Sequence, residues 1–408
     1  MSASRPWGAF LYRDYRYLWA VMVTATVVMW LRILATAQWL LEETGSAVLV
    51  GFIGVVQLVV QVPALLWGGT LADRIDRKRL MLLANGITCA AMLALALLDT
   101  GGLLKPWMVY VGIALTAASQ MFANPARSAM VPMVIPAKHI MLAASTDTAS
   151  QNAAAIAGPL LFAGVAAAAG LTAAFYTAAA IAFVSAILPL LIRAHGVAEG
   201  HAADAPRSTL TQTREGLGYV ARHPILPGLF LLDTGITVAS FYREILPVLA
   251  LGLFAGGASA TGFLGAANST GAILGSFLAL LLAGYRAKGM LVLYASLAYG
   301  VILFGFGTAS TLWLGVLMIA LLGAADAVTV AVRQTTVMLT TPDHMRGRAF
   351  ALMILAAQTA NNVGTIWVGA WAGAIGAGNT MVLGGVISVA ATLLIWRFWR
   401  PIREFRSE

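Results

Sequence analysis

The stretch Gly69-Thr-Leu-Ala-Asp73-Arg74-Ile-Asp76-Arg77-Lys78-Arg79 separates two long apolar runs, at 48–68 and 79–99. A short basic segment between runs of about 20 apolar residues is typical of a cytoplasmic loop between two membrane-spanning helices. Positive charge alone explains neither the glycine nor the first aspartate. A glycine lets two helices approach closely, and an aspartate at the membrane edge can pair with an arginine or face a helix N-terminus. The stretch therefore predicts a structured membrane loop.

The composition of the whole chain agrees with a membrane protein. Of 408 residues, 60% are hydrophobic and 10% are charged, and the mean hydropathy is +0.86. Soluble chains have about 45–50% apolar and about 25% charged residues, so this chain lacks the polar surface that a soluble globule needs. Long apolar runs, without an alternation over ten residues, exclude a transmembrane β-barrel. The composition predicts a polytopic helical membrane protein.

The apolar runs number twelve, and the longest polar stretch, 193–222, falls between the sixth and the seventh. The runs lie near 18–40, 48–68, 79–99, 106–128, 142–165, 171–192, 226–249, 260–283, 288–309, 312–334, 346–369 and 379–399. We therefore expect an all-α fold of twelve transmembrane helices in two pseudo-symmetric six-helix bundles. The N-terminal bundle would span 1–192, the cytoplasmic linker 193–222 and the C-terminal bundle 223–408.

The positions of the basic residues predict the orientation. Of the 25 Lys and Arg residues, all but three fall in one set of loops and ends. Lys105 is in an opposite loop, and Arg32 and Arg243 are inside expected spans. Because basic residues are enriched in cytoplasmic loops, we expect both termini in the cytoplasm and the chain in the bacterial inner membrane. Since no soluble basic face carries interleaved aromatics, the charge of +9 does not indicate nucleic-acid binding.

The two halves of the chain repeat. Four pairs share one separation of 206 residues, namely Arg127 and Arg333, Pro136 and Pro342, Asn152 and Gln358, and Gly158 and Gly364. Six spans between the copies keep both copies in the same orientation. Parallel six-helix repeats are typical of the major facilitator architecture, in which substrate binds near the middle of the membrane between the halves.

The loop resembles the major facilitator motif G-x-L-a-D-R-x-G-R-[KR]. The resemblance implies a conformational latch on the cytoplasmic side, with the residues Gly69, Asp73, Arg74, Arg77, Arg127, Arg333 and Asp343. The chain departs from the motif at Asp76, where the family has glycine, so we expect a different turn there. An ordinary positive loop is the alternative interpretation of the basic residues.

Three further stretches resemble the drug:proton antiporter branch, which contains the enterobactin exporter and the macrolide efflux proteins. They are Thr44-Gly-Ser-Ala47, Phe122-Ala-Asn-Pro125-Ala-Arg127 and Thr341-Pro342-Asp343-His-Met-Arg346-Gly347-Arg348. Gly158-Pro159 in the fifth span resembles the kink motif of exporting members, and an ordinary proline kink is the alternative. The resemblance implies export of an amphiphilic small molecule against inward proton flow.

Ionisable residues inside spans are costly and indicate function by default. Asp233 and Asp326 are the proton-coupling candidates, with Arg32 as a partner that could change the proton affinity of Asp233. The alternative is structural pairing, for example of Arg32 with Asp233 or of Arg333 with Asp326. Arg243 and Glu244, near the outer end of the seventh span, fit a gate or an interface better.

Uncharged polar and aromatic residues give the remaining candidates. Trp30, Gln38, Gln120 and Asn124 could line the substrate cavity, although packing or helix–helix contact explains them equally well. No catalytic or metal-binding constellation is present in the sequence, so we expect no enzyme activity, no metal and no cofactor. The partners expected are a small-molecule substrate, protons and the lipid bilayer, for a monomer. A proton-coupled uptake symporter is the alternative function, followed by a membrane sensor that transports nothing.

Overall fold

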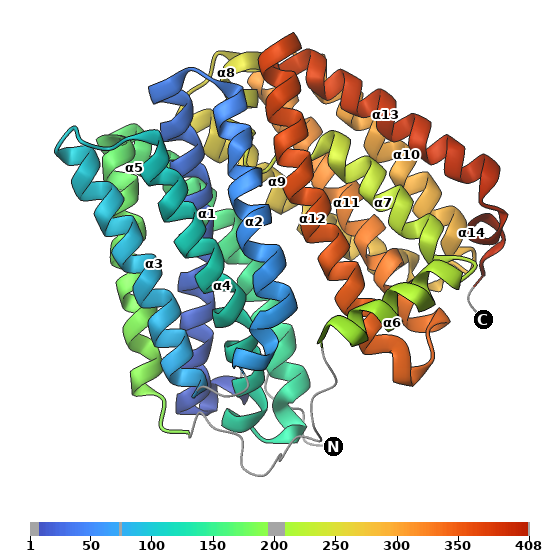
Figure 1. The fold of residues 1–408 in the computed structure, drawn as a ribbon, viewed down its shortest axis with the longest axis horizontal. Coiled ribbons are helices and arrows are strands. Elements are labelled where there is room, and N and C mark those ends of the chain that lie inside the picture. The colour runs from blue at the N-terminus through green and yellow to red at the C-terminus, as the bar shows by residue number, and fades with distance from the viewer. Residues whose placement is uncertain (1–7, 73–75, 195–208, 407–408) are drawn as a thin grey trace. The chain divides into compact units, whose positions relative to one another are not determined.

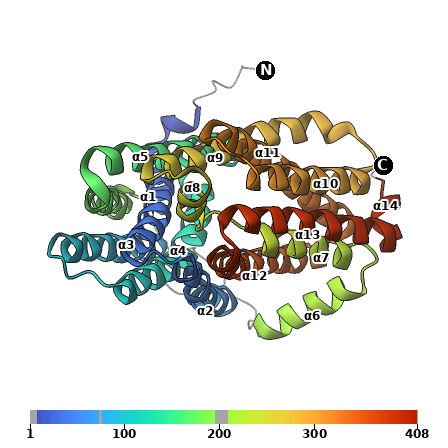
Figure 2. The ribbon, with the colours of Figure 1, turned by 90° about the horizontal axis from the view of Figure 1, so that it is seen from above.

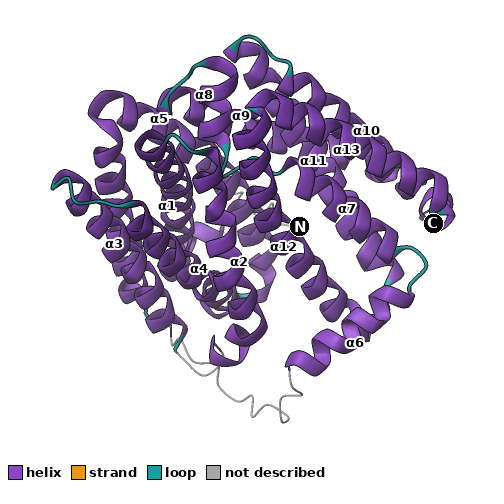
Figure 3. Cartoon of the chain, turned by 45° about the horizontal axis from the view of Figure 1, so that its top comes forward, coloured by secondary structure: helices purple, strands orange, loops and turns teal. Residues whose placement is uncertain are grey.

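The computed structural model describes residues 8–72, 76–194 and 209–406. Within these ranges the chain is helical and contains no strand, as Figure 3 shows. Nine of the described helices are long and apolar enough to cross a membrane. The all-helical fold predicted from composition is confirmed.

The helices follow the twelve apolar runs closely. In chain order they are α1 (Arg13–Thr44), α2 (Ala47–Ala72), α3 (Arg77–Thr100), α4 (Pro106–Val134), α5 (Ile140–Ile187), α6 (Thr209–Arg222), α7 (Leu226–Ser240), α8 (Leu246–Phe254), α9 (Ala258–Leu281), α10 (Lys288–Gly307), α11 (Leu312–Thr340), α12 (Asp343–Ile375), α13 (Ala377–Phe398) and α14 (Arg400–Glu404). Short 3-10 turns are η1 (Gly8–Leu11), η2 (Ala137–His139), η3 (Leu188–Leu191) and η4 (Leu282–Gly284).

Helix α5 contains the fifth and the sixth predicted spans. Its backbone leaves the helical region at Gly170, where φ is 82° and ψ is 177°. A residue with a side chain rarely adopts such a conformation, whereas glycine does so without steric cost. The chain therefore reverses direction at Gly170, and α5 is two membrane-length helices joined at one glycine.

The seventh span is broken, although the sequence predicts one continuous run over 226–249. Helix α7 ends at Ser240 and α8 begins at Leu246, so 241–245 is not helical. Pro247 is at the start of α8, where the missing N–H costs nothing. A continuous helix would bring the proline ring against the carbonyl of Arg243, four residues earlier. The break also places Arg243 and Glu244 between two helix ends.

The expected linker contains a helix that the sequence analysis did not predict. Helix α6 packs on α12, where Val220 joins a buried cluster with Ala349 and Leu352. An ion pair of 2.8 Å between Glu215 and Arg348 joins the same two helices. The apolar face of α6 is short, so the polar composition of 193–222 gives no sign of a helix there.

The described chain divides into two compact units. Unit 1 comprises Met1–Trp39 and Val59–Asp204, and unit 2 comprises Leu40–Leu58 and Ala205–Glu408. In unit 1, α3 packs along α4 and α5 (Figure 1). In unit 2, the main pairs are α9 with α11 and α10 with α13 (Figure 2).

The repeated glycines make equivalent contacts in the two units. A Cβ atom on Gly158 would lie 2.8 Å from Cβ of Trp30, so α5 approaches α1 closely there. A Cβ atom on Gly364 would lie 2.7 Å from Cβ of Phe241, where α12 meets the end of α7. In both units the glycine brings the fifth helix of a bundle against its first, and the sequence repeat is therefore also a repeat of packing.

Candidate functional site

A polar cavity of about 250 Å³ lies inside unit 2. Helices α7, α9, α10, α11 and α12 and the 241–245 break all contribute to it. Its polar and aromatic lining consists of Asp233, Thr237, Ser240, Phe241, Tyr242, Arg243, Asn268, Ser296, Tyr299, Asp326, Thr329, Arg333 and Asn361. Two acids and two arginines face one space, which is rare among apolar helices.

Asp233 on α7 forms an ion pair with Arg333 on α11. The side chains keep only 17% and 7% of their surface exposed, so the two charges are held in contact away from bulk solvent. In the structure, Arg333 therefore pairs with Asp233 on another helix rather than with Asp326 on its own helix. Arg32 is buried in α1 of unit 1, and its action on Asp233 stays a prediction.

Asp326 lies deeper on α11, seven residues before Arg333. Its side chain lines the cavity and interacts electrostatically with Arg243 at the broken span. Two hydrogen bonds fix the aromatic wall, from the amide of Asn268 to the hydroxyl of Tyr242 and between Ser240 and Tyr299. The cavity thus has an acid beside an arginine at two depths.

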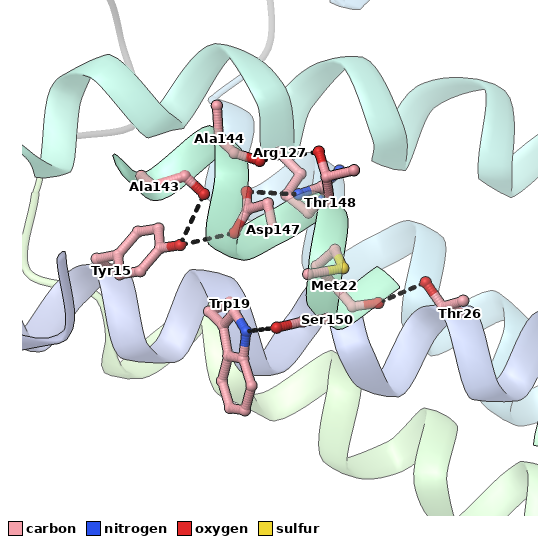
Figure 4. A network of polar contacts seen from close by, with 10 residues as sticks. All are labelled: Tyr15, Trp19, Met22, Thr26, Arg127, Ala143, Ala144, Asp147, Thr148 and Ser150. Atoms are coloured by element: carbon pink, nitrogen blue, oxygen red, sulfur yellow. Dashed lines mark hydrogen bonds and ion pairs between the residues drawn. The ribbon is translucent and has the colours of Figure 1, made fainter. Parts of the chain in front are cut away.

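Unit 1 contains a second polar network, which Figure 4 shows from close by. The hydroxyl of Tyr15 on α1 donates to Oδ1 of Asp147 on α5 at 2.8 Å and to the carbonyl of Ala143 at 3.1 Å. The guanidinium of Arg127 on α4 lies 3.6 Å from Oδ2 of the same carboxylate. The indole of Trp19 donates to Ser150 one turn further along α5.

Sequence reasoning missed Asp147. This residue falls inside the expected span 142–165, so the rule that selected Asp233 and Asp326 selects it as well. The structure places it among three helices, next to the repeated Arg127.

Four of the latch candidates, Arg77, Arg127, Arg333 and Asp343, contact residues of their own units. Arg77 donates to the carbonyl of Ala129 at 3.2 Å, and exposed Asp343 pairs with Arg346 at 2.7 Å. Asp76 caps α3 by accepting from the backbone N–H groups of the second and third residues after it, which gives the departure from the family motif a helix-capping role. Gly69 falls in the last part of α2, and Asp73 and Arg74 lie outside the described residues.

The substrate-cavity candidates from the first half belong to unit 1. Trp30 and Gln38 are buried in α1, Gln120 is half-buried in α4 and Asn124 is exposed there. None of the four lines the unit 2 cavity. Their role stays a prediction.

A family model and relatives of known name match most of this sequence. The model of the family described as "Transmembrane secretion effector" matches residues 4–407. The enterobactin exporter EntS of Citrobacter koseri is 28% identical over 371 residues, which cover 89% of this chain and 83% of that protein. EntS of Escherichia coli O81 is 28% identical over 308 residues, covering 75% and 72%.

Solved structures share the fold. A nucleoside transporter, NupG, has a TM-score of 0.80 at 13% identity and covers 94% of this chain and 99% of its own. A D-xylose-proton symporter has a TM-score of 0.67 at 15% identity, with 94% and 98% covered. Together with the apolar helices, these likenesses identify a multi-pass bacterial membrane protein with a transporter fold. The chain belongs to the transmembrane secretion effector family of the major facilitator superfamily.

Proposed function

We propose that the protein is a secondary active exporter, which moves an amphiphilic small molecule out of the cell by proton antiport with alternating access. The observation that carries this proposal is the unit 2 cavity, in which Asp233 pairs with Arg333 and Asp326 lies near Arg243. A carboxylate beside an arginine favours its ionised form. A change of state that separates the pair lets the acid bind a proton.

Antiport requires that proton affinity differ between the inward-facing and the outward-facing states. Asp233 meets this requirement because its partner is on another helix, so a shift of α7 against α11 changes the distance between the two charges. Asp326 is the reserve candidate, and Arg32 is the partner that could act on Asp233 in another state. Family membership and the exporter relatives support outward transport, as does Gly158-Pro159.

The lining of the cavity supports two substrate classes. Arg243 and Arg333 suit an anionic siderophore, and two of the relatives are named enterobactin exporters. Asp233 and Asp326 suit a cationic, macrolide-like drug. Ligand sites for drug-sized molecules have volumes of about 300–1,000 Å³, so a cavity of about 250 Å³ holds one part of such a molecule.

Transport into inverted membrane vesicles tests the function. We expect labelled siderophores or drugs to accumulate when the vesicle interior is acidified, and accumulation to stop when an uncoupler removes the gradient. Substrate that leaves the vesicles together with protons would indicate the uptake symporter instead. If the amount of every compound from both classes inside the vesicles were the same with and without the gradient, the result would indicate the sensor.

Asp233→Asn tests the coupling. We expect gradient-driven export to fall to the level of empty vesicles, because the asparagine cannot exchange a proton, while substrate binding persists and loses its pH dependence. The measurements are vesicle transport and substrate binding to purified protein across pH. The control is Glu43→Gln, which neutralises an exposed acid at the end of α1 and should transport normally. Normal export by Asp233→Asn would move the proton site to Asp326 or remove it from both.

A further inference from the structure

Asp147 is an acid that the proposed mechanism does not use. It is the eighth residue of α5, so it lies roughly 10 Å along that helix from its first residue. Its side chain keeps 19% of its surface exposed, and Arg127 keeps 16%. Tyr15, its hydrogen-bond donor, is completely buried. Three helices, α1, α4 and α5, thus converge on one carboxylate within unit 1 (Figure 4).

The two oxygens of this carboxylate are in different environments. Oδ1 accepts the Tyr15 hydroxyl at 2.8 Å. Oδ2 has Arg127 at 3.6 Å, which is well beyond the roughly 2.7–2.9 Å of a charge-assisted hydrogen bond. A proton can therefore bind Oδ2 without breaking a hydrogen bond within the described part of the chain. Asp233 differs, because its ion pair with Arg333 is in direct contact.

Among the described residues, the charged and titratable groups around Asp147 are few. Helix α1 presents Tyr15 and α4 presents Arg127, and these two act on the carboxylate electrostatically. At the start of α5, His139 is hydrogen-bonded to Tyr12 at 3.1 Å rather than to Asp147. The charge balance at Asp147 thus depends on one arginine across one helix–helix contact.

The sequence repeat relates the Arg127–Asp147 pair to the Arg333–Asp233 pair. Arg127 and Arg333 are equivalent positions, yet the acid comes from α5 in unit 1 and from α7 in unit 2. The positions equivalent to the two acids are apolar, namely Met353 and Val27. Each unit therefore has one repeated arginine with one acid, contributed by different helices.

We propose that Asp147 is a second proton-binding site, in unit 1, with Arg127 as its charge partner and Tyr15 as its positioning residue. As a coupling site it rests on the proposed antiport function. Proton occupancy of Asp147 follows the spacing of α4 and α5. Helix shifts of about 1–2 Å in conformational transitions are a sizeable fraction of the 3.6 Å between the two charged groups. A closer Arg127 releases the proton, and a more distant one retains it.

Infrared titration of the purified full-length protein in lipid nanodiscs tests the site without a substrate. We expect a protonated-carboxyl band in the wild type that is lost, by the equivalent of one group, in Asp147→Asn. The control is Glu43→Gln, which neutralises an exposed acid elsewhere in the chain and should leave the Asp147 band in place. If Asp147 protonates only together with exposed acids, near about pH 4, the pair is structural and the proposal is overturned.

Two matched variants on α1 separate a proton site from a structural contact. Tyr15→Phe keeps the ring but removes a hydrogen bond to the ionised carboxylate, so the Asp147 band should move to higher pH. Trp19→Phe removes a hydrogen bond between the same two helices that does not involve Asp147, and should leave the band in place. Equal shifts in both variants would overturn the role of Tyr15.

A transport measurement then separates this inference from the proposed function. We expect Asp147→Asn vesicles to export fewer protons per substrate than the wild type. Wild-type antiport with an unchanged ratio in Asp147→Asn would overturn the coupling role of Asp147 and leave the proposed function intact. If the wild type shows no antiport, the function fails, and the infrared titration still decides whether Asp147 binds a proton.

Discussion

His223, just before α7, has a ring nitrogen that caps the helix. Its Nδ1 accepts the backbone N–H groups of Ile225 at 3.1 Å and Leu226 at 3.2 Å. Burial lowers the pKa of the His223 imidazole, and a hydrogen bond with the backbone of Thr340 opposes this effect only in part. A protonated ring would lose its acceptor and place a positive charge at a helix N-terminus. The folded protein therefore favours neutral His223.

Stability should consequently depend on pH through His223. The unfolded chain binds a proton below about pH 6.5, whereas the folded chain does so only at a lower pH, so stability falls as the pH drops through this window. We expect the melting temperature of the wild type to decrease more than that of His223→Asn between about pH 7.5 and about pH 5.5. Asparagine keeps an acceptor without titrating. Equal decreases in both proteins would contradict the assignment.

The sequence located two of the three acids of the candidate sites. Asp233 and Asp326 stand out because a carboxylate in a long apolar run has no other ready explanation. The sequence does not identify their partners. Arg243 comes near Asp326 at the break after α7, and Arg333 meets Asp233 because α7 and α11 line the same cavity. Asp147 has the same signal, and only the structure separates it from a loop residue.

At the scale of elements, glycines set the distance between α9 and α11. A Cβ atom on Gly271 would lie 1.8 Å from the carbonyl oxygen of Ala320, and one on Gly275 would lie 2.2 Å from that of Ala324. The two glycines are four residues apart, so they face the same neighbour. Small residues at this spacing let helix backbones pack in contact inside a membrane.

Gly271→Ala should therefore destabilise unit 2. The added methyl group meets backbone rather than a movable side chain, and we expect a loss of about 1–3 kcal/mol, as for overpacked cores. The control is Gly86→Ala in α3, where nothing lies within 4 Å of the added carbon and helix propensity favours alanine. The melting temperatures in detergent compare the two. A Gly271→Ala protein as stable as Gly86→Ala would contradict the close packing.

Element boundaries show where sequence patterns fail. The twelve apolar runs appear as helices because hydrophobic length is a strong signal. Hydropathy cannot show the interruption at 241–245, since that segment is flanked by apolar residues and its cause is one proline, Pro247. It also cannot show α6, whose helix is stabilised by packing on α12 rather than by its length.

At the scale of the whole molecule, both halves pair an arginine with an acid, but only the position of the arginine is repeated. The repeated arginines keep their places, near the ends of α4 and α11, while their acids come from different helices. A transporter that binds substrate in one unit and protons in both units would benefit from acids that differ between the units. We expect these unequal ion pairs, on equivalent frameworks, to give the two halves distinct proton affinities.

The orientation in the membrane is the last prediction, and it follows from charge. Leu103 is exposed in the loop between α3 and α4, beside Lys105, and Tyr285 is exposed beside Arg286, before α10. Five predicted spans separate the two positions, so they should face opposite sides, with Tyr285 on the basic, cytoplasmic side.

The chain contains one cysteine, Cys89, so Cys89→Ala gives a clean background for labelling. Leu103→Cys should then react with an impermeant maleimide on intact spheroplasts, and Tyr285→Cys only on inverted vesicles. Labelling of both positions from one side would mean that the number of crossings between them is even. The opposite pattern of labelling would place the termini outside, against the distribution of basic residues.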